Sequence, residues 1–123
     1  MTENKLEGLE FVNLMKEKFE SSSELTEEFA NFSKIFAKGF RKYLQREFKA
    51  TDIDFSRGHF YMSGFFTVDG QTWYFNSGDL RWNKSFMIRT AKNNKDYTGG
   101  SNIYVGIDTL EIFDQDLRRY ILK

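Results

Sequence analysis

Apolar residues recur at steps of three and four along the first fifty residues, which is the spacing of one helix face. The first run comprises Leu6, Leu9, Val12 (or Phe11), Met15 and Phe19. Three serines at 21–23 interrupt it, and Ser23 or Thr26 is a candidate N-cap for the next helix. A stronger second run follows: Leu25, Phe29, Phe32, Phe36, Phe40, Tyr43 and Leu44. We therefore predict an N-terminal pair of helices that pack antiparallel.

After residue 51 the apolar positions alternate, which predicts strands. Residues 52–55 predict a short strand, and 59–68 and 71–76 flank Asp69 and Gly70, a pair typical of a two-residue hairpin turn. Gly64 predicts a bulge or a close backbone contact. Further strands are expected over 85–91 and 103–107, and helical spacing returns over 109–123.

The expected fold class is α+β, with an N-terminal helical pair, an antiparallel β-sheet with a central hairpin, and a C-terminal helix. A chain of 123 residues without repeats or linkers is expected to form a single domain over 1–123. Apolar residues make up 40% of the chain and 14 residues are Phe, which is sufficient for a core without disulfides or metal.

The chain has no Cys, which excludes disulfides, thiolate zinc sites, iron–sulfur clusters and a thiol nucleophile. The first residues lack the basic and apolar regions of a signal peptide, and no apolar stretch approaches 18 residues. We therefore expect a cytoplasmic protein that has no cofactor and does not bind a membrane.

The net charge of zero conceals an uneven distribution. Residues 1–28 hold eight acidic and three basic side chains, whereas 29–50 hold six basic side chains and one acidic one. The six are Lys34, Lys38, Arg41, Lys42, Arg46 and Lys49. On a helix these six side chains fall within an arc of about 140°, opposite the apolar and aromatic residues of the second run. Such a row is typical of a solvated helix face, but it also suits an acidic protein surface, a nucleic-acid-loaded partner or nucleic acid itself.

The segment 89–102 is a long connection that combines cations with a Gly-Gly pair. Arg89, Lys92, Lys95 and Tyr97 would suit contact with a macromolecular partner, and Gly99-Gly100 could form an anion-binding nest. The segment lacks both glycine-rich phosphate-binding motifs, G-x-x-x-x-G-K-[ST] and G-x-G-x-x-G, which argues against a nucleotide site. A plain sheet connection is the simplest interpretation.

Aromatic residues occur on both sides of the predicted hairpin. If helices cover one side only, then Tyr61, Phe65, Tyr74 or Trp82 would be exposed. Exposed aromatics beside Arg57, Arg81 and Arg89 would suit an interface hot spot or a base-stacking platform. A sheet covered on both faces is the alternative.

Signals for catalysis are weak. His59 is the sole histidine and would need an orienting carboxylate, and Asp52 and Asp54 share one strand face. Glu47 and Lys49 match the E-x-K element of a metal-dependent nuclease, but they lie about 200° apart on a predicted helix. We therefore expect no enzyme, no catalytic residue and no metal site, with a small metal-dependent nuclease as the third alternative.

The segments SRGHFYMSGFF, WYF and RTAKNNKDYTGGSN resemble small uncharacterised proteins of phages and mobile elements in Gram-positive bacteria. The resemblance covers about residues 56–102 and carries no motif with known chemistry. It implies an interaction protein that binds host machinery, in the manner of an anti-CRISPR inhibitor. The leading hypothesis is thus a non-catalytic inhibitor of a host nucleic-acid enzyme such as a CRISPR effector, bound to a host protein or protein–nucleic-acid complex. The alternative is direct nucleic-acid binding.

Overall fold

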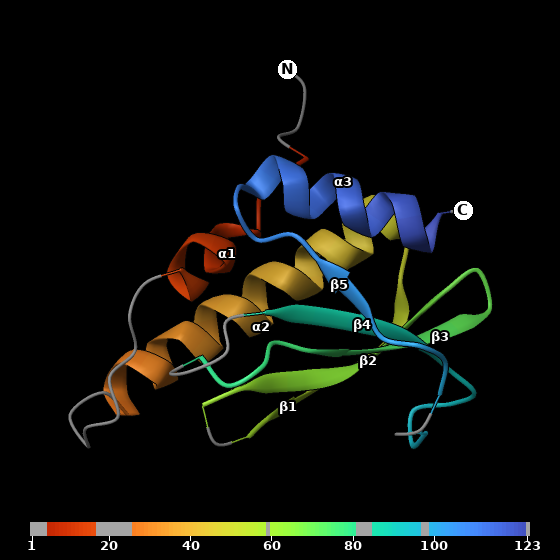
Figure 1. Ribbon diagram of the computed structural model, residues 1–123, viewed down its shortest axis with the longest axis horizontal. Helices are drawn as coiled ribbons and strands as arrows, with labels where there is room; N and C mark the ends of the chain where they lie inside the picture. The colour runs from red at the N-terminus through yellow and green to blue at the C-terminus, as the bar shows by residue number, and fades with distance from the viewer. Residues whose placement is uncertain (1–4, 17–25, 59, 81–84, 97–98, 123) are drawn as a thin grey trace.

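The computed structural model describes residues 5–16, 26–58, 60–80, 85–96 and 99–122, with side chains from residue 29 onward in the second segment. Within these ranges the chain forms three helices and a five-stranded antiparallel sheet (Figure 1). The elements are α1 (Glu10–Met15), α2 (Thr26–Phe48), β1 (Thr51–Arg57), β2 (Met62–Val68), β3 (Gln71–Asn76), β4 (Phe86–Ala91), β5 (Ile103–Val105) and α3 (Leu110–Ile121). The predicted α+β class is confirmed.

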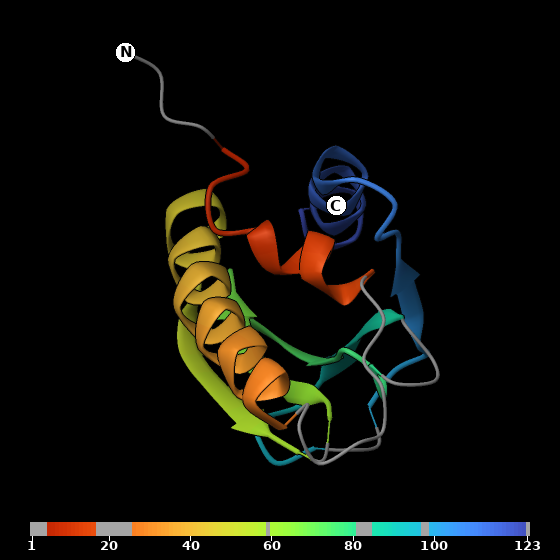
Figure 2. The ribbon, with the colours of Figure 1, turned by 90° about the vertical axis from the view of Figure 1, so that its left-hand side faces the viewer.

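The strands lie side by side in chain order, from β1 at one edge to β5 at the other. The sheet curves beneath the three helices, which lie on the same side of it (Figure 2). Antiparallel strands place alternate side chains on opposite faces. Phe55 pairs with Gly64, and Phe75 pairs with both Gly64 and Ile88, so the three apolar side chains of this row share the face that meets the helices. One core of buried residues therefore joins the sheet to all three helices.

Aromatic rings fill the space between α2 and the sheet. Phe36 and Phe40 are fully buried and contact the rings of Phe11, Phe75 and Phe86 at centroid distances of 4.5–6.4 Å. The apolar residues that recur at three- and four-residue steps in the sequence form the face of α2 that meets the sheet.

Helix α1 is shorter than the pattern predicted. It begins at Glu10, because Gly8 has φ of +100° and the chain before it turns, with the amide of Leu9 donating to the carbonyl of Leu6. The apolar positions of the pattern still meet the core. Ser23 and Phe19 lie outside the described residues.

The predicted hairpin is present. Asp69 and Gly70 link β2 to β3 with φ values of +48° and +82°, as a two-residue turn of this type requires. The close backbone contact expected at Gly64 is also present, because a Cβ there would collide with the carbonyl oxygen of Asp54. The bulge lies on the neighbouring strand instead, between Thr51 and Asp54.

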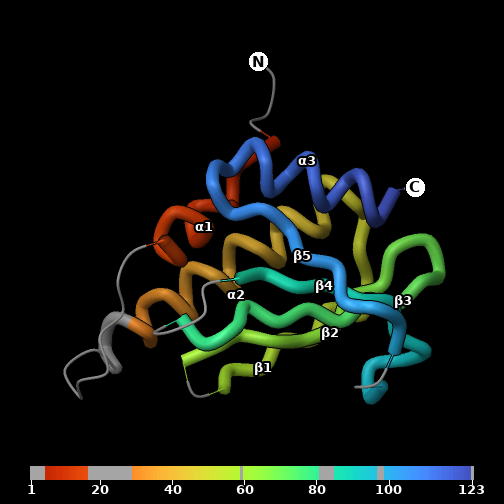
Figure 3. Tube along the Cα trace, in the orientation of Figure 1, coloured from red at the N-terminus to blue at the C-terminus, as the bar shows by residue number. Residues whose placement is uncertain are grey.

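Helix α3 begins where the sequence predicted. Thr109 is its N-cap, and its hydroxyl accepts the amide hydrogen of Ile112 at 3.1 Å. Its C-terminal end lies above the end of the sheet that carries the β2–β3 turn (Figure 3).

Candidate functional site

The outer face of α2 carries a row of exposed cations. Lys34, Lys38, Arg41 and Lys42 are exposed, while Phe32, Phe36, Phe40 and Tyr43 on the opposite side of the same helix are buried. No carboxylate among the described residues forms an ion pair with the three lysines of this row. We call Lys34, Lys38, Arg41 and Lys42 the α2 cation row.

Arg41 is anchored more firmly than the lysines. Its guanidinium donates to the carbonyl of Ile53 at 3.3 Å and lies 5.2 Å from the centre of the Phe55 ring. It therefore presents a positioned positive charge at the junction of α2 and β1.

Two predicted members of the row differ from the rest. Arg46 is half-buried, pairs with Glu47 at 2.6 Å and donates to the carbonyls of Lys5 and Glu7. Because these contacts tie the N-terminal segment to α2, the expectation that Arg46 is part of an open cationic face is wrong. Lys49 is exposed but follows the end of α2 with φ of +54°.

A groove of about 410 Å³ runs beside the α2 cation row. Lys38, Lys42 and Ile35 line one wall, and Glu7 and Glu10 line the other. The backbones at the bottom of the groove approach closely, because Gly8 and Gly39 leave no room for a Cβ on either side. Glu7 and Glu10 thus reduce the positive potential along part of the α2 cation row.

Inward from the row, a polar cluster joins α2 to α3. The Tyr43 hydroxyl donates to the buried carboxylate of Asp114 at 2.7 Å, and Arg118 bridges Asp114 and Glu47. Burial and then the hydrogen bond to Asp114 raise the pKa of Tyr43 well above its ordinary value, so the phenol stays neutral. Burial opposes the charge of Arg118, but its hydrogen bonds to Glu47 and Asp114 outweigh burial and raise its pKa.

The same contacts lower the pKa of Glu47. Burial favours its neutral form, yet the hydrogen bonds from Arg46 and Arg118 outweigh burial and hold the pKa below its usual value of 4.5. A carboxylate with a depressed pKa stabilises the fold above its unfolded-state pKa, and this contribution is lost as pH falls through the folded-state pKa.

We expect Glu47→Gln to lower the free energy of unfolding at neutral pH, and the difference from the unmodified chain to shrink as the pH falls below about 4.5. Urea unfolding at a series of pH values measures this. Glu111→Gln, at an exposed position of α3, is the matched control. If the loss of stability caused by Glu47→Gln did not depend on pH, the lowered pKa of Glu47 would be contradicted.

The sheet face that points away from the helices carries a second set of candidates. Phe65, Tyr74 and Arg89 pair across β2, β3 and β4, and the Arg89 guanidinium lies 4.6 Å from the centre of the Tyr74 ring. Phe65 is 3% exposed and Tyr74 7%, so the expectation that they are exposed is wrong. They bury one another in a small cluster with Ala91 and Met87.

Among the described residues, Tyr104 is the large exposed aromatic on this face. It is 63% exposed on the edge strand β5, opposite Met87. Sequence reasoning did not select it, although the alternation of Ile103, Tyr104 and Val105 places its side chain opposite to its neighbours. Tyr61 is half-buried, with its ring against Gly58. Trp82, Tyr97 and His59 lie outside the described residues.

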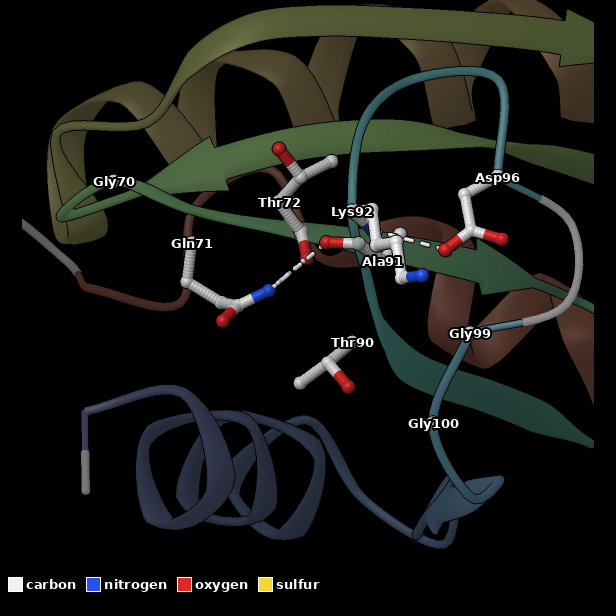
Figure 4. Close-up of a pocket in the computed structure, with 9 residues that line it drawn as sticks. All are labelled: Gly70, Gln71, Thr72, Thr90, Ala91, Lys92, Asp96, Gly99 and Gly100. Atoms are coloured by element: carbon white, nitrogen blue, oxygen red, sulfur yellow. Dashed lines mark hydrogen bonds between the residues drawn. The ribbon is translucent and has the colours of Figure 1, made fainter.

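The segment 89–102 begins as part of β4 and leaves the sheet at Lys92. Figure 4 shows its loop beside the β2–β3 turn, around a pocket of about 610 Å³. The Asp96 carboxylate accepts the Lys92 amide hydrogen at 3.0 Å, and the Gly100 amide donates to the carbonyl of Thr90 at 2.9 Å. The Gly100 amide is therefore occupied within the chain, which argues against an anion nest at Gly99-Gly100. The amines of Lys92 and Lys95 are exposed.

Within the described ranges, no three His, Asp or Glu side chains gather as a metal site would require. Glu47 is held by Arg46 and Arg118, and Asp52 and Asp54 are exposed on β1. No described helix is long and apolar enough to cross a membrane.

Comparison with known proteins yields no family model, curated protein or solved structure that matches this chain.

Proposed function

We propose that this chain is a non-catalytic interaction protein that binds a larger macromolecular partner through the α2 cation row. The observation that carries the proposal is the row itself: four cations on one exposed helix face, with none of its lysines paired to a described carboxylate. Such a row complements an acidic surface, steers encounter and makes the association sensitive to salt.

The resemblance to small phage and mobile-element proteins supports a more specific form of the proposal. The partner would be a host enzyme that carries nucleic acid, such as a CRISPR effector, and the chain would inhibit it. The row would then contact an acidic surface of the enzyme or the phosphates of its bound nucleic acid.

The triple variant Lys34→Ala/Lys38→Ala/Lys42→Ala is expected to bind the partner about tenfold more weakly or worse, mainly through slower association. A tagged chain recovers the partner from a host lysate, and affinity is then measured with the purified partner at two salt concentrations. Because all three side chains are exposed, the variant should fold normally.

Lys92→Ala/Lys95→Ala provides a matched control that removes charge from the loop instead. If the triple variant kept its affinity for the partner and the loop variant lost it, the interface would lie at the loop, and the proposal would be contradicted.

Direct binding of nucleic acid is the second candidate. Tyr104 favours it, because an exposed aromatic on an open sheet face can stack on a base. An anisotropy titration of the free chain with single- and double-stranded oligonucleotides at low and high salt separates the two functions. The second candidate predicts salt-sensitive binding that Tyr104→Ala weakens, and no binding even at low salt would remove it.

A further inference from the structure

The groove beside the α2 cation row combines an apolar lining with charged walls. Its volume of about 410 Å³ is within the range of sites that enclose a ligand or an inserted side chain. Its lining is more apolar than polar, and Ile35 is half-buried in it. Lys38 and Lys42 also line the groove, and long lysine side chains add apolar methylene stems to such a surface while their charges stay in water.

A backbone contact fixes the bottom of the groove. A Cβ on Gly8 would collide with the carbonyl oxygen of Gly39, and a Cβ on Gly39 would collide with that of Gly8. Arg46 holds the segment before α1 against α2, because its guanidinium donates to the carbonyls of Lys5 and Glu7 (Figure 2). The groove is therefore formed in the free chain, which reduces the entropic cost of binding.

The two walls carry opposite charges that stay apart. Lys38 and Lys42 form a lysine wall on α2, and Glu7 and Glu10 form a glutamate wall on the segment that leads into α1. All four residues are exposed. Among the residues that the structure describes, neither glutamate forms an ion pair with either lysine. A segment that enters the groove therefore meets cations on one side and carboxylates on the other.

This arrangement favours a protein segment over nucleic acid. The glutamate wall repels phosphates, and an apolar lining is stabilising only for an apolar group. An extended peptide places alternate side chains on the same side. A segment with an acidic, an apolar and a basic side chain at every second position therefore matches the lysine wall, the apolar lining and the glutamate wall together.

We propose that the groove binds an extended segment of the partner protein in which an apolar side chain stands between an acidic and a basic one. The acidic side chain pairs with the lysine wall, the apolar one lies against Ile35 and over Gly39, and the basic one pairs with the glutamate wall. This proposal rests on the proposed function, because the lysine wall belongs to the α2 cation row. It assigns the contact to the partner's protein chain rather than to its nucleic acid.

Four capped pentapeptides test the groove without the partner. Glu-Ser-Leu-Ser-Lys carries the full pattern, Glu-Ser-Leu-Ser-Glu and Lys-Ser-Leu-Ser-Lys carry one sign of charge, and Glu-Ser-Ser-Ser-Lys lacks the apolar side chain. Each is titrated into ¹⁵N-labelled protein up to its solubility limit, and the amide cross-peaks of Gly8 and Gly39 are followed by NMR. We expect the full pattern to move both peaks with saturation, and the other three peptides to bind about fivefold more weakly or worse.

Glu7→Gln/Glu10→Gln gives opposite results for a protein segment and for nucleic acid. Both side chains are exposed, so the variant should fold normally. It should weaken binding of Glu-Ser-Leu-Ser-Lys and of the purified partner about threefold. A partner held through phosphates would instead bind this variant more tightly. Lys34→Ala is the matched control, because it removes a cation of the α2 cation row that does not line the groove, and it should leave peptide binding unchanged.

The proposal would be overturned if the groove amides responded equally to all four peptides or to none. Tighter binding of the partner by Glu7→Gln/Glu10→Gln would also overturn it, in favour of contact with nucleic acid. The proposed function is tested separately, because the triple lysine variant loses affinity for the partner in either case.

Discussion

Phe40→Ala is expected to lower the free energy of unfolding by about 3–5 kcal/mol, the largest effect of any single apolar truncation in this chain. Phe40 is fully buried at the centre of the core. Its ring lies within 6.4 Å, centroid to centroid, of those of Phe11, Phe36, Tyr43, Phe55, Phe66, Phe75, Phe86 and Phe113. Removing the ring leaves a cavity bounded by other rings, which cannot all move to fill it.

Chemical denaturation measures this loss. Gln45→Ala is the matched control, because Gln45 is exposed on the same helix and alanine favours the helical state. The control should stay within about 0.5 kcal/mol of the unmodified chain. A Phe40→Ala loss no larger than that of the control would show that the aromatic core is not packed as described.

Asp114→Ala is expected to lower the free energy of unfolding by about 3–5 kcal/mol as well, for an electrostatic reason. Asp114 is 1% exposed and accepts hydrogen bonds from the Tyr43 hydroxyl and the Arg118 guanidinium. Its removal leaves the Tyr43 hydroxyl buried without this acceptor and takes one of two carboxylates from Arg118.

A double-mutant cycle isolates the central contact of this cluster. Tyr43→Phe, Asp114→Ala and the double variant should give a coupling energy between about 0.5 and 3 kcal/mol. Glu111→Ala, which removes an exposed acid of the same helix, serves as control. Additive effects of Tyr43→Phe and Asp114→Ala would contradict the hydrogen bond between the two side chains.

Local signals were sufficient to predict most of the fold. The phenylalanine spacing identified α2 because a helix packed on a sheet repeats its contacts every three to four residues. Asp69-Gly70 identified the hairpin because few other pairs accept positive φ at both positions. The length of α1 was not predictable in this way, because the turn at Gly8 depends on the close contact with Gly39 on α2.

The site was harder to predict, because its residues depend on contacts that are distant in sequence. Arg46 has the same helical spacing as the exposed lysines, but Glu47 and the carbonyls of the N-terminal segment hold it, and Arg118 on α3 shares Glu47. The alternation of side chains along β3 places Tyr74 on the sheet face away from the helices, where exposure would be expected, but Phe65 and Arg89 cover its ring.

Lysine acylation footprinting, read by mass spectrometry, tests the central claim most directly. The free chain and its complex with the partner are treated with the same amine-reactive reagent, and the reactivity of each lysine is compared. Lys34, Lys38 and Lys42 are exposed in the free chain, so their protection in the complex is the predicted result, with Lys92 and Lys95 as internal references. Equal reactivity of all three lysines in the free chain and in the complex would contradict the claim that function resides on this face of α2.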